Sequence, residues 1–363
     1  MNTIELLYQI FRARYNLDSV RQSLERKYRL ALLGGEEEVQ RLRAWLGEPT
    51  LASGAQPEEA PLVLATPLDQ DSNEALRKVD AALYHVGSRL PDEGFLRQQA
   101  EWIPPGVPTL WVREPLPGEE PDQPATDPTL PRVWRLDPVR SAEHLARLVL
   151  SSFPDLSIRL ARDFSRVRLE CARRLTSRTA TRMAMVAAAS SVTVSIPVVG
   201  QLLGLLAVTG ETMVITASQL RLCLLMGALY GRPLDFFDRV DELWPVVGGA
   251  LGWRTLARQA VGFVPLAGPV AKAAIAWSGT WMVGEGSRLF YEFGEHLPEP
   301  VKKKLEEEAR RQGLEEAARY VKALREGRQE GDAEWPEDDG WIPGEGPAGE
   351  ALPPKPEPGP ASA

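Results

Sequence analysis

The chain has 363 residues, with 50 acidic and 42 basic side chains and a net charge of −8, a length that suits two domains better than one packed unit. Its 44% hydrophobic and 25% charged residues exclude a multi-span membrane protein and a wholly disordered chain. The acidic balance argues against nucleic acid as the main partner, because phosphate binding needs a basic surface. Cys171 and Cys223 are the only cysteines and fit neither a disulfide framework nor a zinc site. With no signal-peptide pattern at the N-terminus, a reducing cytoplasm is predicted.

The first part of the chain alternates short apolar runs with longer amphipathic ones. Two short amphipathic helices are predicted within residues 1–26, followed by an α/β domain over residues 27–153. Its strands are predicted over Tyr28–Leu33, Pro61–Thr66, Val107–Val112 and Arg132–Leu136. Its helices are predicted over Glu36–Trp45, Asn73–Val86 and Ser141–Ser151. Strands that alternate with helices form βαβ units, so a small Rossmann-like or P-loop-like domain with a parallel sheet is expected.

From residue 154 to residue 326 the pattern is helical throughout and predicts an all-helical domain with apolar helical hairpins. Apolar residues from Leu156 to Leu175 follow one face of a helix, and arginines gather on the opposite face. These arginines are Arg159, Arg162, Arg166 and Arg173. We expect them to form a charged docking face.

Two long apolar stretches follow these arginines. Residues 183–210 carry no charge, and Pro197 is expected to divide this run into a hairpin. The second stretch, residues 244–283, centres on the loop-like sequence Phe263–Pro269. A charged, solvent-exposed helix is predicted over Pro300–Arg325. The remaining residues, 327–363, include nine Asp or Glu and are expected to be disordered.

A glycine turn between the first strand and the first helix of the α/β domain is where such a domain would hold phosphate. The turn is Leu33-Gly34-Gly35-Glu36, but the P-loop pattern GxxxxGK[ST] is absent, with Gln40, Arg41 and Leu42 at its last three positions. Three glutamates, Glu36, Glu37 and Glu38, occupy the first helical turn, where they complement the helix dipole and repel phosphate. Gly34 and Gly35 are therefore interpreted as a vestigial turn that binds no cofactor.

Other chemistry has little support in the sequence. The three histidines, His85, His144 and His296, have no partner at metal-ligand spacing and are expected to be structural. Asp69 and Asp71 follow a predicted strand but are interpreted as caps of the next helix. No GxSxG nucleophile elbow occurs. No catalytic residue, metal ligand or cofactor is assigned.

The order of strands resembles that of an Era-type GTPase domain, with Pro61–Pro67 and Val107–Val112 in the places of two central strands. In that family the latter strand leads into the guanine-reading NKxD motif. Those positions here are Arg113, Glu114, Pro115 and Leu116. The later serine-alanine loop corresponds to Arg135-Leu136-Asp137. Because three nucleotide motifs are absent together, the resemblance implies a pseudo-GTPase.

The helical region resembles the family called domain of unknown function 697. The resemblance rests on Ser195–Gly200 (SIPVVG), Thr216–Arg221 (TASQLR) and Leu229–Leu234 (LYGRPL) in this order, and it spans about residues 155–295. Leu222 stands where a methionine is usual in the family. Such domains often follow Era-like GTPase domains, and some relatives associate with the inner membrane; the family implies an architecture but no reaction.

Two interpretations of the apolar stretches stay open. A spanning helix needs about 20 apolar residues, and the uncharged run exceeds this, yet its proline, glycines and hydroxyl side chains make it less apolar than a clean span. It is either a buried hairpin of a soluble domain or a hairpin that contacts or enters a bilayer. The candidate contact residues in these stretches are Ile196, Pro197, Gly200, Gly204, Phe263, Pro265 and Gly268.

The sequence thus predicts a non-catalytic pseudo-GTPase scaffold or adaptor, whose helical domain binds a protein partner or an anionic membrane surface. The expected location is the cytoplasm, with association with the inner membrane, and a homo-oligomer is left open. One alternative is a nucleotide hydrolase that uses an unorthodox site near Gly34 and Asp69. Another is a soluble helical module that binds a partner without contacting a membrane.

Overall fold

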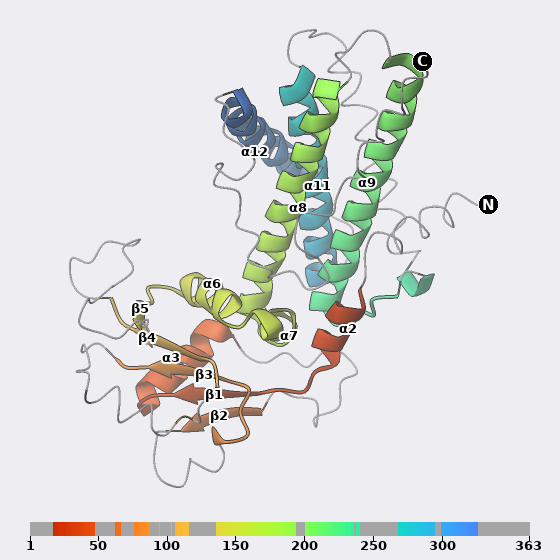
Figure 1. The fold of residues 1–363 in the computed structure, drawn as a ribbon. Coiled ribbons are helices and arrows are strands. Elements are labelled where there is room, and N and C mark those ends of the chain that lie inside the picture. The colour runs from red at the N-terminus through yellow and green to blue at the C-terminus, as the bar shows by residue number, and fades with distance from the viewer. Residues whose placement is uncertain are drawn as a thin grey trace, which may run out of the picture.

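The computed structural model describes residues 17–47, 62–66, 76–87, 94, 103, 106–115, 136–193, 200–235, 237–239, 268–294 and 299–325. These residues form a parallel sheet with flanking helices, followed by a helical region (Figure 1). The predicted fold class, α/β plus α, is therefore confirmed.

The sheet is parallel throughout its described part, with strand order β2-β1-β3-β4-β5. Its strands are β1 (Arg29–Leu33), β2 (Leu62–Thr66), β3 (Ala81–His85), β4 (Thr109–Arg113) and β5 (Leu136–Pro138). Neighbouring parallel strands need a crossover connection, and in the described part of the chain α3 (Glu36–Leu46) supplies the one from β1 to β2. The chain runs from β1 to the edge strand β2 and then back past β1 to β3. The direction of winding consequently reverses between β1 and β3.

The predicted helix over Asn73–Val86 is wrong. A short turn at residues 76–78 precedes β3, whose five residues, Ala81-Ala82-Leu83-Tyr84-His85, are all buried. A central strand covered on both faces shows no alternation of polar and apolar residues. This segment also contains alanine and leucine, which favour helices. Residues 81–85 form a strand because they pair with β1 and β4, and this pairing cannot be recognised from the local sequence.

The two faces of the sheet are covered differently. Helices α3 (Glu36–Leu46) and α6 (Ala142–Ser152) pack on one face, where successive strands contribute Leu30, Leu32, Leu83, Leu110 and Val112. The opposite face carries Ala31, Leu33, Ala82, Tyr84 and Trp111, packed against Leu76, Val79 and Ile103. This separation follows from the period of two along a strand. The helices predicted over Glu36–Trp45 and Ser141–Ser151 are confirmed within one residue.

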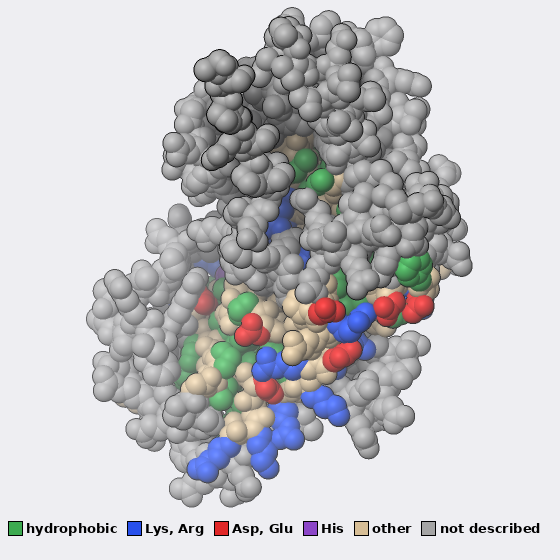
Figure 2. Space-filling model, turned by 45° about the vertical axis from the view of Figure 1, so that its right-hand side comes forward, with side chains coloured by type: hydrophobic (Ala, Val, Ile, Leu, Met, Phe, Trp, Pro, Cys, Tyr) green, Lys and Arg blue, Asp and Glu red, His purple; other side chains and the backbone are tan. Residues whose placement is uncertain are grey.

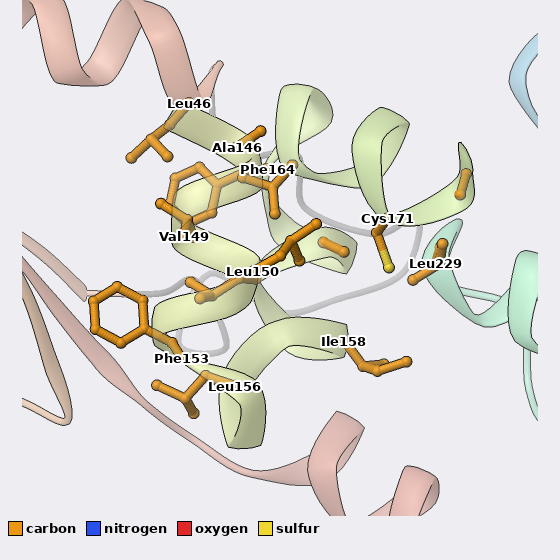
Figure 3. Packing of buried hydrophobic residues seen from close by; sticks show 14 of the residues in the cluster. Leu46, Ala146, Val149, Leu150, Phe153, Leu156, Ile158, Phe164, Cys171 and Leu229 are labelled. Atoms are coloured by element: carbon orange, nitrogen blue, oxygen red, sulfur yellow. The ribbon is translucent and has the colours of Figure 1, made fainter. Parts of the chain in front are cut away.

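The first face of the sheet continues directly into the helical region. One cluster of buried residues extends from α2 (Asp18–Glu25) and the sheet through α6 to the helices beyond residue 154. Figure 3 shows part of this cluster, where Phe164 lies against Val149 of α6 and close to Leu46 of α3. The α/β part and the helical part therefore share a core where they meet.

Phe164 also interrupts what was predicted to be one helix from Leu156 to Leu175. The structure has a 3-10 turn η2 (Pro154–Leu156), α7 (Ser157–Asp163) and then α8 (Ser165–Thr193). Phe164 itself has φ −113° and ψ 121°, an extended conformation. The break turns its ring into the shared core, where it is 2% exposed. Burial of an aromatic side chain is worth about 1.5–3 kcal/mol, which offsets the lost helical continuity.

Long helices make up the rest of the helical region. They are α8, α9 (Gly200–Leu229), α11 (Gly268–Phe293) and α12 (Glu299–Arg325), with a 3-10 turn η3 (Phe237–Arg239) after α9. Gln219 of α9 donates to Thr280 of α11 at 3.1 Å, and Ser287 of α11 donates to Cys223 of α9 at 3.4 Å. From the first of these contacts to the second, the residue numbers rise on both helices, so α9 and α11 run parallel. Helix α8 is antiparallel to them (Figure 1).

Small residues let these helices approach closely. Ala180, Ala184 and Ala188 of α8 pack against Ala273 and Ala274 of α11. The predicted charged helix is confirmed as α12, and most of its surface is exposed, but Ala309 and Ala317 are buried against the bundle. The helical region is thus held by close backbone contact as well as by large apolar side chains.

Gly284 provides a test of this packing. A Cβ at Gly284 would lie 2.6 Å from Cγ2 and 2.9 Å from Cβ of Thr176 on α8. We expect Gly284→Ala to lower the free energy of unfolding by about 1–3 kcal/mol, although alanine itself favours a helix by about 1 kcal/mol. Adding Thr176→Ala removes the nearer Cγ2 contact but keeps the Cβ of residue 176, so it should restore part of the loss, as measured by chemical denaturation. Equal loss in the single and double variants would contradict close packing at this crossing.

Among the described helices, none combines the length and the apolarity that crossing a bilayer requires. Residues 194–199 and 240–267, which contain Pro197 and the first part of the predicted loop Phe263–Pro269, lie outside the described residues, whereas Gly268 and Pro269 begin α11, so the predicted loop is wrong at its end. The predicted hairpin turn at Pro197 therefore stays a prediction. The predicted amphipathic helix before residue 26 is confirmed as α2, and the one before it also lies outside the described residues, as does the segment 327–363.

Candidate site at the carboxyl ends of β1 and β3

In an open α/β sheet, ligands bind beyond the carboxyl ends of the strands at the point where the winding reverses. That point here is defined by the turn Gly34-Gly35 after β1 and the turn Val86-Gly87 after β3. Gly35 is the N-cap of α3, so the start of this helix faces the same edge. The vestigial phosphate turn predicted from sequence is therefore located where a ligand of such a fold would bind.

Gly34 allows the two turns to lie in contact. It has φ +143°, a conformation rarely adopted by residues with a side chain, and a Cβ there would lie 2.7 Å from the carbonyl oxygen of His85. The obstacle is backbone, which cannot move aside as a side chain can.

We expect Gly34→Ala to destabilise the protein by about 2–4 kcal/mol, because backbone strain and a steric overlap act together. The matched control is Gly106→Ala, since Gly106 also has positive φ, +90°, but open space where its Cβ would lie. Thermal and chemical unfolding of both variants gives the difference. A loss no larger than that of Gly106→Ala would show that the two turns are not held in contact.

Glu38 covers both turns. Its Oε1 lies 3.2 Å from the position of a Cβ on Gly87, and its Oε2 reaches the corresponding position on Gly35. Gly35 is the N-cap and Glu38 the third residue of the helix, the position from which a glutamate reaches back over the start of a helix in a capping box. The carboxylate therefore lies where a phosphate would approach the helix N-terminus.

The cations near this carboxylate are engaged elsewhere. Arg41 of α3 pairs with Glu114, which follows β4. Arg113 at the end of β4 is buried and donates from Nη1 to the carbonyl of Glu114 at 2.9 Å. The sequence-based expectation places Arg113 and Glu114 at the first two positions of a guanine-reading motif. In the structure Glu114 is paired with Arg41 and the Arg113 side chain is buried.

His85 lies beneath this arrangement and is 1% exposed. Its Nδ1 accepts from the backbone N–H of Gly87 at 3.0 Å, which places the proton of the neutral ring on Nε2. Nε2 has no hydrogen-bond partner among the described residues. Burial, with a smaller contribution from Arg41, lowers the pKa of His85 to about 4. Burial, assisted by Glu38, raises the pKa of the neighbouring Tyr84 to about 12. Both side chains are thus neutral at pH 7.

Sequence reasoning located the turn and the repulsive carboxylates but missed three features of the site. It placed His85 in a helix, did not single out Glu38 among its neighbours, and assigned no role to Glu114. The position of Glu38, three residues after a glycine N-cap, was the available signal. The contribution of β3 could not be recognised because that segment was expected to be helical.

The predicted docking face of four arginines does not form as expected. Arg159 is 8% exposed, and its Nε donates to Asp163 Oδ2 at 3.0 Å while Nη1 donates to the carbonyl of Leu24. The break at Phe164 gives α7 a different direction from α8, so the helical-wheel prediction does not hold across it. Arg162 is partly buried, whereas Arg166 and Arg173 are exposed.

Of the apolar contact candidates, only backbone positions are described. Gly200 and Gly204 lie in the first turns of α9, and Gly268 is the first residue of α11. Ile196, Pro197, Phe263 and Pro265 lie outside the described residues. Their predicted contact role therefore stays a prediction.

Nucleophile and metal chemistry gains no support from the described part of the chain. Cys171 and Cys223 are free and buried, and burial raises the pKa of Cys171 far above that of an exposed thiol and that of Cys223 to about 11. The described residues contain no group of three or more His, Cys, Asp or Glu side chains arranged to hold a metal ion.

Comparison with known proteins adds no relative. No protein-family model matches the chain, and no curated protein or solved structure shows significant similarity to it.

Proposed function

We propose that this protein is a non-catalytic scaffold or adaptor. In this proposal its α/β domain is a pseudo-GTPase, and its helical domain contacts a protein partner or a membrane surface. The observation that carries the proposal is the position of Glu38 across the turns at Gly35 and Gly87. A ligand phosphate and this carboxylate would compete for one place.

Electrostatics makes that competition unfavourable for a nucleotide. Two unit charges about 4 Å apart repel by about 4 kcal/mol at an effective dielectric constant near 20. A triphosphate carries several such charges, and Glu36 and Glu37 add to the field from the same helical turn. Arg41, the nearest cation of the helix, is paired with Glu114. The strand order also supports the proposal, because a nucleotide site would be built where the winding of a parallel sheet reverses, here between β1 and β3.

The proposal is tested by equilibrium binding of fluorescent GTP and ATP analogues in the presence of Mg²⁺. We expect no binding at micromolar concentrations of protein for either nucleotide. Glu38→Gln, which removes the charge at the turns, is compared with Glu37→Gln, which removes an exposed charge one residue away. Micromolar affinity of the unaltered protein would overturn the pseudo-GTPase assignment and favour a nucleotide hydrolase.

A further inference from the structure

A strongly basic surface lies at the opposite end of the sheet from the site just described. The strands begin there, and the chain segments that meet at this end carry exposed cations. We call this surface the amino-end rim. Its basic residues are Arg26, Lys27, Arg29, Arg43, Arg77, Lys78 and Arg166, all exposed.

Hydrogen bonds bring these segments together. Asp80 N donates to the carbonyl of Arg29, and Asp80 Oδ2 accepts from the Arg29 N–H, both at 2.9 Å. The turn that carries Arg77 and Lys78 is thereby placed beside the start of β1. Asp80 Oδ1 also accepts from Arg26 at 3.5 Å. Two segments that lie about 50 residues apart in the sequence thus form one surface.

The end of α3 joins the same rim. The helix runs back from the carboxyl end of β1 to the amino end of the sheet, so Arg43 and Gly47 lie near the strand starts. A Cβ on Gly47 would lie 3.5 Å from Cγ of Arg166 at the start of α8. Figure 2 shows Lys and Arg side chains gathered over the lower part of the described surface.

The rim is basic although the whole chain has a net charge of −8. Among the described residues its seven cations are accompanied by three carboxylates, Glu25, Asp80 and Asp155, and Asp80 is partly neutralised by Arg26. Grouping of like charge on one face costs free energy in the isolated protein and attracts an opposite charge to that face.

We propose that the amino-end rim docks the protein onto an anionic lipid surface. The cations come from separate segments around one end of the molecule. This arrangement can face the flat layer of anionic headgroups on a membrane. Salt screens charges beyond the Debye length of about 10 Å, so a plane of headgroups at this end is attracted mainly by the cations of the rim.

An exposed aromatic side chain lies near α2, the helix that leads into the rim. Phe237 is 54% exposed, and it lies two residues from Asp235, which pairs with Arg21 of α2 at 3.0 Å. Aromatic rings and cations together are typical of membrane–water interfaces. The inference rests on the adaptor role proposed above and adds a membrane-contacting surface, most of whose residues belong to the α/β domain, to the contact proposed for the helical domain.

The test is sedimentation of the full chain with vesicles of phosphatidylcholine alone or mixed equally with phosphatidylglycerol. We expect binding only to the mixed vesicles, and its loss when NaCl rises from about 0.1 M to about 1 M. Each cation near an anionic surface contributes about fivefold to the partition coefficient. The variant Lys27→Gln, Arg29→Gln, Arg77→Gln, Lys78→Gln should therefore bind several hundredfold more weakly, that is about 10²–10³-fold.

The matched control removes four exposed cations from α12, namely Lys303→Gln, Lys304→Gln, Arg310→Gln and Arg319→Gln. It changes net charge equally and should bind as the unaltered chain does. Equal losses in the two variants, or no binding to mixed vesicles, would overturn the proposal. Binding to polyglutamate or to single-stranded RNA but not to vesicles would also overturn it, since the partner would then be a protein or a nucleic acid. None of these outcomes depends on nucleotide binding.

Discussion

Replacement of Asp163 by alanine is expected to lower the free energy of unfolding by about 3–5 kcal/mol. Asp163 Oδ2 accepts from Arg159 Nε and from Tyr28 Oη, each at 3.0 Å, and all three side chains are buried. Removing the carboxylate leaves the Arg159 guanidinium without its counter-charge. Tyr28 precedes β1 and Asp163 ends α7, so the variant also weakens the junction between the sheet and the helical region.

The control for this prediction replaces the whole group, as Tyr28→Phe, Arg159→Met and Asp163→Leu. Apolar replacement of a buried ion pair is often close to neutral, so the triple variant should be more stable than Asp163→Ala. Burial raises the pKa of Asp163 above its ordinary value despite Arg159, which indicates a substantial desolvation cost. A loss below about 1 kcal/mol for Asp163→Ala in urea denaturation would show that the group is not coupled as described.

Acidification from pH 7 to pH 4 is expected to remove about 3 kcal/mol of stability through His85. Its pKa falls from 6.5 in the unfolded chain to about 4 in the folded protein because burial disfavours the charged ring. The unfolded state therefore binds the proton more readily, so the contribution is present above pH 6.5 and is lost as the pH falls toward 4. At about 1.36 kcal/mol per pH unit, roughly 2 kcal/mol should be lost by pH 5.

The measurement is the free energy of unfolding between pH 7.5 and about pH 5. The raised pKa of Asp163 has the opposite effect and stabilises the folded state at lower pH, so the upper part of the range isolates His85. His85→Gln should reduce the slope of the free energy of unfolding against pH. His144→Gln, at a partly exposed position near the start of α6, should leave that slope unchanged. An unchanged slope in His85→Gln would contradict the assignment.

Several elements of the fold could be predicted because their signals are local. Glu36–Leu46 and Ala142–Ser152 show helical periodicity with clear starts, and β1 and β4 are short apolar runs. The alternation of these elements was sufficient to predict a parallel sheet. It could also be predicted that the glycine turn repels phosphate, because the charges of Glu36–Glu38 directly follow Gly35 in the chain.

The remaining features depend on contacts between distant segments. β3 is a strand because β1 and β4 pair with it, and Arg159 is buried because Phe164 turns the chain and brings Asp163 and Tyr28 together.

The sequence by itself determined the element types of the strongly periodic segments, the overall charge and the lack of a P-loop pattern, since each depends on neighbouring residues. Only the tertiary structure decided that Glu38 covers Gly87 as well as Gly35, and that cations from Arg26 to Arg166 meet on one rim. The physical reason is that hydrogen bonds between strands and burial of apolar side chains choose which distant segments become neighbours. A one-dimensional pattern specifies which faces need burial but not which partners bury them.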